Sequence, residues 1–167
     1  MEDQPEKGPS VEDIRRALGG LVTEGLIPYN VGENGGCLLD LAIVQAQRKP
    51  VPRDAPEPDR HAADAEALTS VLQDAVNHKD ISGKHRRLLR DVLPLRPELL
   101  GKVVKERRKE AGKDLKPGKK DIGPGTIRTY YEPKALKKLS EVLWRLESEF
   151  RAAYRNGKSA DSDEQDS

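Results

Sequence analysis

The chain is poor in the residues that build large apolar interiors and covalent cross-links. Of its 167 residues, 35% are hydrophobic and 4% are aromatic, with a single Trp and a single Phe. Globular domains usually contain about 45–50% apolar residues, so a large aromatic core is excluded. Hydrophobic runs are short, and none approaches the roughly 18 apolar residues that a membrane-spanning helix needs. The one cysteine, Cys37, excludes an internal disulfide and a multi-cysteine zinc site.

Sequence motifs that carry enzymatic chemistry are missing. There is no Walker-type phosphate loop, no Gly-x-Gly-x-x-Gly after a strand and no Gly-x-Ser-x-Gly. The histidines, His61, His78 and His85, do not have the spacing of a recognised zinc site. Cys37 has acidic neighbours instead of the cationic groups that activate a thiol. We therefore expect no enzyme, no catalytic residue, no metal and no cofactor.

The first residues, 1–9, are polar and acidic and do not resemble a signal peptide. Together with the single cysteine, this composition leads us to expect a soluble cytoplasmic protein that has no membrane partner.

Charge is distributed unevenly along the chain, although the formal net charge is +1. Residues 1–83 hold 8 basic and 15 acidic residues, a net charge of −7. Residues 84–145 hold 19 and 8, a net charge of +11, and residues 146–167 hold 3 and 6, a net charge of −3. Such a basic segment favours an anionic partner, most often nucleic acid, because clustered Lys and Arg release counterions from phosphates. The alternative is that the basic segment packs against the acidic first half.

The apolar spacing predicts a mainly α fold, a small helical domain of four to five helices with disordered polar tails. A capping box at Ser10–Asp13 begins the first helix, and further helices are expected over 59–79, 82–93, 97–112 and from Pro133 to about Asn156. The expected boundaries are a disordered tail over 1–9, a helix-plus-hairpin module over 10–45, a Pro-rich linker over 46–58, a helical domain over 59–156 and an acidic disordered tail over 157–167.

Residues 26–44 predict one short β-hairpin near the N-terminus. A Gly- and Asn-rich turn separates Leu26–Tyr29 from the apolar run that follows Cys37, which is the pattern of two strands and a loop. A short buried helix over Leu38–Val44 is the alternative, because a run of this length has no decisive periodicity.

A Lys-rich loop with several glycines and prolines lies between Gly112 and Thr126. Mobile cationic loops suit phosphate contacts, and the threonines, arginine and tyrosine that follow suit phosphates or base edges. The alternative is a solvated loop followed by tyrosines that pack on the last helix. The candidate nucleic-acid-binding residues are Lys102, Lys116, Lys119, Lys120, Thr126, Arg128, Thr129 and Tyr130.

The last predicted helix has an apolar stripe with steps of three and four residues, which is the spacing of a two-stranded seam. The alternative is a core helix of the domain. Trp144 lies off the stripe and is a second candidate contact, because Trp is enriched in interface hot spots. The candidate partner-binding residues are Leu136, Leu139, Leu143, Trp144, Leu146 and Phe150.

Two stretches resemble DNA-binding families. Leu100–Gly112 looks like the first helix of lambda-repressor-like helix-turn-helix domains, and Thr126–Pro133 resembles the recognition-helix run of that family, within a match over 100–143. The resemblance implies that Thr126, Arg128, Thr129 and Tyr130 contact DNA. The family's second helix is replaced here by a stretch with two Pro-Gly pairs.

Residues 11–44 are similar to the recognition helix and wing of winged-helix regulators. The similarity is carried by Ile14–Ile27, followed by a Gly-rich segment in the place of the wing. It implies that Arg15 and Arg16 face phosphate. The two preceding helices of that fold have no counterpart upstream.

The leading functional hypothesis is a small cytoplasmic DNA-binding or regulatory protein that uses the basic segment 84–145 and its Lys-rich loop. The alternative is a non-enzymatic adaptor or accessory subunit that associates through its C-terminal amphipathic helix. The candidate partners are accordingly nucleic acid, another protein or a second copy of the chain.

Overall fold

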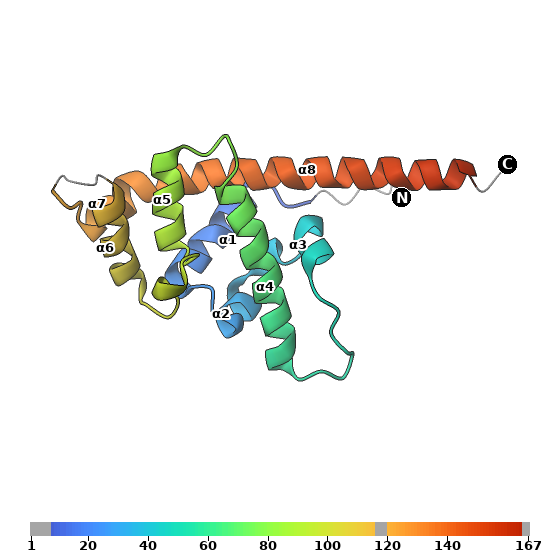
Figure 1. Cartoon of the computed structure of the whole chain (residues 1–167), viewed down its shortest axis with the longest axis horizontal. Helices are drawn as coiled ribbons and strands as arrows, with labels where there is room; N and C mark the ends of the chain where they lie inside the picture. Colours follow the sequence, from blue (N-terminus) through green and yellow to red (C-terminus); the bar gives the residue numbers. More distant parts are fainter. Residues whose placement is uncertain (1–7, 116–119, 165–167) are drawn as a thin grey trace.

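The computed structural model describes residues 8–115 and 120–164, with side chains as far as residue 156. The described part is mainly helical, as the sequence predicts. Short helices form a body against the first part of one long helix, α8 (Glu132–Glu164), which runs along the molecule and projects beyond the body (Figure 1). The helical backbone of α8 thus includes most of the segment over 157–167 that was predicted as a disordered tail.

The first helix, α1 (Val11–Glu24), begins as predicted. Ser10 Oγ accepts a hydrogen bond from Asp13 N at 3.1 Å, and the Asp13 carboxylate accepts one from Ser10 N, so both halves of the capping box are present. The helix ends at Gly25, whose φ of +90° is unfavourable for other residues. Its buried side chains pack in the core beside α8, and they are Ile14, Leu18, Leu21 and Val22.

The predicted β-hairpin over 26–44 is wrong, because the described residues contain no strand. The segment forms α2 (Pro28–Asn34), a 3-10 turn (Gly36–Leu38) and α3 (Ala42–Gln47). Pro28 follows an extended Ile27 and pre-sets the first helical φ, so the chain turns into a helix where a strand was expected. The buried residues recur at helical spacing, not in alternation, and they are Val31, Leu38, Leu41 and Val44. The wing implied by the winged-helix similarity is therefore absent.

A buried carboxylate joins α3 to α8. Ala42 N and Ile43 N, at the beginning of α3, donate hydrogen bonds to the two oxygens of Glu147, at 2.9 and 3.1 Å. These amides have no partner within the helix, and a carboxylate also interacts favourably with the positive end of the helix dipole. Glu147 therefore fixes the place where α8 leaves the body.

The middle of the chain forms α4 (Glu57–Val76), α5 (Gly83–Val92) and α6 (Val104–Leu115). The Pro-rich segment before α4 forms no helix or strand and contains a turn in which Ala55 N donates to Pro52 O. Arg48 and Lys49 pair with carboxylates of α4. The helix predicted from Pro97 begins later. Pro97 opens only a 3-10 turn, and Gly101 at φ +92° separates this turn from α6.

Gly112 lies inside α6 and does not end it. Ile122 N donates a hydrogen bond to Gly112 O at 3.2 Å, and a Cβ at residue 112 would overlap the Ile122 carbonyl. Glycine is needed there because the returning backbone contacts the helix directly.

The last helical stretch begins before the predicted Pro133. The chain is continuous from α7 (Pro124–Thr126) through a π turn (Ile127–Tyr131) into α8. A proline within a helix lacks a donor and crowds the carbonyl four residues earlier, which here belongs to Thr129 in the π turn. The wider π turn lets the helix continue past Pro133.

Candidate nucleic-acid interface

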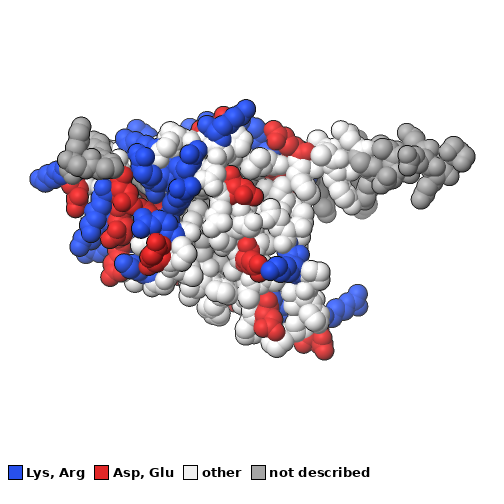
Figure 2. Space-filling model, in the orientation of Figure 1, with Lys and Arg blue, Asp and Glu red and all other residues white. Residues whose placement is uncertain are grey.

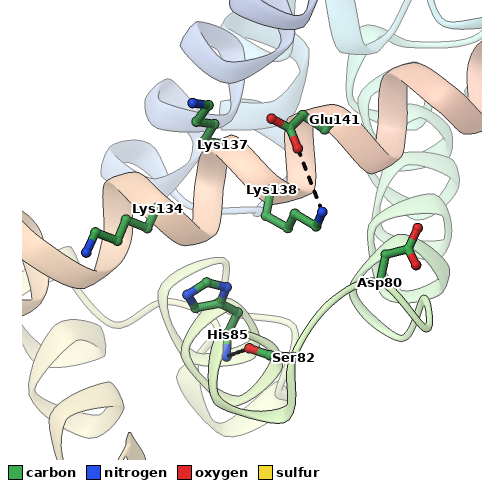
Figure 3. Close-up of a pocket in the computed structure, with 7 residues that line it drawn as sticks. All are labelled: Asp80, Ser82, His85, Lys134, Lys137, Lys138 and Glu141. Atoms are coloured by element: carbon green, nitrogen blue, oxygen red, sulfur yellow. Dashed lines mark hydrogen bonds and ion pairs between the residues drawn. The ribbon is translucent and has the colours of Figure 1, made fainter.

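Cationic side chains from α5 and α8 meet at the beginning of α5. Ser82 Oγ caps this helix by accepting a hydrogen bond from His85 N at 3.2 Å. The His85 imidazole points toward α8, whose first turns carry Lys134 and Lys138 (Figure 3). A pocket of about 340 Å³ lies between the two helices, and it is lined by Asp80, Ser82, His85, Lys134, Lys137, Lys138 and Glu141.

The acidic residues of this pocket are already paired. Asp80 forms an ion pair with Arg145, and Glu141 lies 3.9 Å from Lys138 Nζ. By contrast, Lys134 and Lys137 are exposed and have no carboxylate partner among the residues that the structure describes. The pocket therefore has cationic side chains available for an external anion.

The charge of the pocket acts on His85. Burial lowers the pKa of His85, and the positive charges of Lys84, Lys134 and Lys138 lower it further. Lys84 itself lies over the ring of Tyr131, with its Nζ 4.6 Å from the ring centroid. We name Lys84, His85, Lys134, Lys137 and Lys138 the basic surface.

Figure 2 shows Lys and Arg gathered at the end of the molecule where α5, α6 and the beginning of α8 lie. Several acidic residues are interspersed with them on this face.

Several arginines of this region are used inside the fold. Arg107 is 1% exposed, and its guanidinium donates hydrogen bonds to the carbonyls of Thr23, Val92 and Lys102. Arg86 donates in the same way to three carbonyls near the end of α4, and Arg108 forms a two-point ion pair with Glu132 at 2.8 Å for each bond. These groups bind the helices to one another and are not available to a partner.

Arg96 holds two carboxylates with one nitrogen. Its Nη1 lies 2.9 Å from Asp91 and 2.9 Å from Asp114. Burial and the neighbouring Asp114 raise the pKa of Asp91 to about 8, although Arg96 opposes the shift. One carboxyl group of this pair therefore holds a proton at neutral pH.

The sequence-predicted binding residues fall into four groups. Thr126, Arg128, Thr129 and Tyr130 are exposed at the beginning of the helical stretch that continues into α8, so they lie on the same helix as Lys134. Lys120 is exposed in the segment before this stretch. Lys116 and Lys119 lie outside the described residues.

Lys102 lies apart from that group. It precedes α6 and lines a different cavity of about 310 Å³, together with Ile27, Val103 and Arg107. Sequence reasoning placed Lys84, Lys134 and Lys138 in the basic segment but did not select them. The missing information was contact between α5 and α8, which no local pattern encodes.

The leucines of the candidate partner seam are in the core. Leu136, Leu139 and Leu143 are 6%, 0% and 0% exposed, which fits the alternative of a core helix. Leu146 is partly buried, whereas Trp144 is 46% and Phe150 36% exposed. An interface on α8 is thus restricted to its exposed residues.

The surroundings of Cys37 disfavour its thiolate form. Burial raises the pKa of its thiol, and the negative charge of Asp13 adds to the shift. Its Sγ contacts the carbonyl of Asp13 at 3.5 Å.

No family model matches the chain, and neither a curated protein nor a solved structure matched it. Among the described helices, none is long and apolar enough to cross a membrane.

Proposed function

We propose that the protein binds nucleic acid, with DNA as the first candidate, through the basic surface of α5 and α8. The observation that carries the proposal is the group of Lys84, Lys134 and Lys138 around His85, close enough to lower its pKa. Burial of a phosphate among them relieves this mutual repulsion and releases counterions.

Exposed side chains next to the basic surface extend the proposed contact. Arg128 and Tyr130 are exposed one to two helical turns before Lys134, and Tyr130 is 66% exposed. Arginine binds phosphate with two hydrogen bonds, and a tyrosine ring can stack on an unpaired base. The lysines would give affinity, and Arg128, Thr129 and Tyr130 would add contacts to sugars or base edges.

The proposal includes a regulatory role in the cytoplasm, which the helix-turn-helix resemblance of residues 100–143 favours. It assigns no target sequence, because phosphate contacts position a protein without reading bases.

The test is a titration of the full chain into labelled mixed-sequence duplex DNA, followed by anisotropy at about 50 mM salt, where phosphate-driven binding is strong. The variant combines Lys84→Ala, Lys134→Ala and Lys138→Ala. We expect its affinity to fall by about 100-fold, because three lost phosphate contacts at about 1 kcal/mol each amount to about 3 kcal/mol.

The matched control combines Lys49→Ala, Arg53→Ala and Arg60→Ala. These residues lie between α3 and the first turn of α4, away from α5 and α7 in Figure 1, and their loss removes the same charge. Equal losses of affinity in the two variants would show that only net charge matters and would contradict a site on α5 and α8. Wild-type protein that does not bind the duplex would contradict the DNA proposal itself.

A second candidate is an adaptor that binds a protein partner through α8. Trp144 and Phe150 are exposed on the part of α8 around the point where Glu147 ties it to the body. For this function, the variant that combines Trp144→Ala with Phe150→Ala would reduce capture of a protein partner, or self-association measured by sedimentation. Both kinds of association would depend much less on salt than DNA binding does. Unchanged sedimentation and capture in the variant would remove α8 as the interface.

A further inference from the structure

Three side chains of types that ligate metals converge where α2 meets the beginning of α4, outside the basic surface. They are Glu33 in the last turn of α2, and Glu57 and His61 in the first turns of α4. Glu57 and His61 are four residues apart on one helix, so they share a face. Ligand atoms of the three side chains all lie within 4.8 Å of one another. We propose that these residues bind a divalent transition-metal ion, with Zn²⁺ as the best fit.

The distances within the cluster match those of a coordination shell. His61 Nε2 lies 3.5 Å from Glu57 Oε1. Two ligand atoms that are each about 2.1 Å from a tetrahedral zinc ion are about 3.4 Å from one another. The two groups on α4 are thus already spaced as ligands of one ion. Glu33, whose ligand atom lies within 4.8 Å of the other two, completes the set with a movement of about 1–2 Å.

The neighbours of His61 hold its ring in place. A Cβ at residue 32 would overlap the imidazole, so Gly32 lets α2 lie directly against it. Tyr29 packs edge-on to the same ring, with centroids 6.2 Å apart. The His61 side chain is 14% exposed, whereas that of Glu57 is 66% exposed. A fixed imidazole combined with two carboxylates that reach solvent leaves a position for water as a fourth ligand.

The donor set selects the kind of ion. Two carboxylates balance the charge of a divalent cation, and an imidazole favours first-row transition metals over Mg²⁺ and Ca²⁺. Binding would relieve the repulsion between Glu33 and Glu57 and would connect α2 to α4. Because the complete site exists only in the folded chain, the ion would stabilise that chain.

The test uses the full chain after treatment with a chelator. Equilibrium dialysis against Zn²⁺ measures the metal bound per chain, and thermal unfolding with and without Zn²⁺ measures its effect on stability. We expect one Zn²⁺ per chain and a higher unfolding temperature. Glu33→Gln and Glu57→Gln should each weaken binding by about tenfold or more, because an amide is a poorer zinc ligand than a carboxylate.

The two glutamine variants decide the test, because His61→Ala also removes packing against α2. Their unfolding temperatures in chelator should not fall below that of the wild type, because each variant removes one of two neighbouring carboxylate charges. The matched control is His78→Gln, which changes a histidine that pairs with Asp80 outside the cluster and should keep full Zn²⁺ binding. Wild-type protein that binds no Zn²⁺ up to about 100 µM would overturn the proposal, as would unchanged affinity in both glutamine variants or loss of binding in His78→Gln.

Discussion

Positively charged side chains lie both between the helices α5, α6 and the beginning of α8 and on the outer surface of these helices. The two regions use them differently. Inside, Arg107 donates to three backbone carbonyls, and Arg108 binds Glu132 with both ends of its guanidinium. Outside, Lys134 and Lys137 are exposed without a carboxylate partner among the described residues. The planar, multi-donor guanidinium suits fixed internal contacts, whereas a lysine ammonium keeps its charge in water.

The net charge of a segment therefore overstates the positive charge that a partner can contact. The basic segment has a net charge of +11, but several of its arginines are consumed by carbonyls and carboxylates of the fold. The exposed lysines, together with exposed arginines such as Arg128, are what remains for an external anion. Interior substitutions should therefore change stability, and surface substitutions should change binding.

The largest expected effect is that of Arg107→Met. The methionine keeps much of the apolar stem, but it leaves the carbonyl of the buried Val92, and those of Thr23 and Lys102, without their donor. An unsatisfied buried carbonyl costs about 1–3 kcal/mol and the other two lost bonds add to this, so the free energy of unfolding should fall by about 3 kcal/mol. Urea unfolding measures this loss, and a change below about 1 kcal/mol would show that the carbonyls are satisfied in another way.

A smaller effect is expected for Glu132→Gln. Glu132 is 8% and Arg108 14% exposed at their side chains, so the neutral amide leaves a mostly buried guanidinium with a poorer partner. We expect a loss of about 2 kcal/mol in the free energy of unfolding, measured by the same denaturant titration. Equal stability of the variant and the wild type would show that this ion pair contributes nothing to the free energy of unfolding.

The carboxyl pair on Arg96 predicts a pH dependence. Asp91 has a pKa of about 8 in the folded chain and about 3.8 in the unfolded chain, so the folded chain binds more protons between these values. The contribution of Asp91 to stability should therefore fall as pH rises from about 4 to about 8. In Asp91→Asn, which cannot ionise, this contribution is removed, so stability should fall less with rising pH than in the wild type.

The free energies of unfolding of wild type and Asp91→Asn, measured at about pH 5 and about pH 8.5, check this prediction. These two pH values bracket most of the range between the unfolded and folded pKa of Asp91. Parallel pH profiles for the two proteins would show that Asp91 is ionised throughout and that Arg96 outweighs its burial.

The smallest effect on stability is expected for the surface lysines. The variant with Lys84→Ala, Lys134→Ala and Lys138→Ala should lose no more than about 1 kcal/mol, chiefly from the contact of Lys84 with Tyr131. The pKa of His85 should rise in this variant, because the charges that lower it are gone. Histidine titration by NMR measures the shift, and an unchanged pKa would mean that burial alone sets it.

Local signals in the sequence predicted the beginnings of several helices. The capping box at Ser10–Asp13 is present where expected, and Ser82 caps the helix predicted over 82–93, since these signals act through hydrogen bonds within a few residues. The hairpin over 26–44 failed because its turn-rich composition is shared by short helices. Packing of Val31 and Val44 against the core decided between the two.

The sequence predicted that the candidate site is positively charged, but it did not predict which residues form it. The sequence shows that residues 84–145 are basic, but Arg107 and Lys134 look alike in it, although one is buried and the other exposed. Their difference depends on which carbonyls and helices come together from distant parts of the chain. The cluster of Glu33, Glu57 and His61 could not be predicted from the sequence for the same reason, because α2 and α4 come together only in the folded chain.

The most direct test of the comparison is the salt dependence of DNA binding by the wild type and by the variant lacking Lys84, Lys134 and Lys138. If these lysines contact phosphates, the slope of log Kd against log salt should decrease by about 2–3 units in the variant between about 50 and 200 mM salt. The control lacking Lys49, Arg53 and Arg60 should keep the wild-type slope. An unchanged slope in the lysine variant would contradict the account, because DNA would then be bound by other cations.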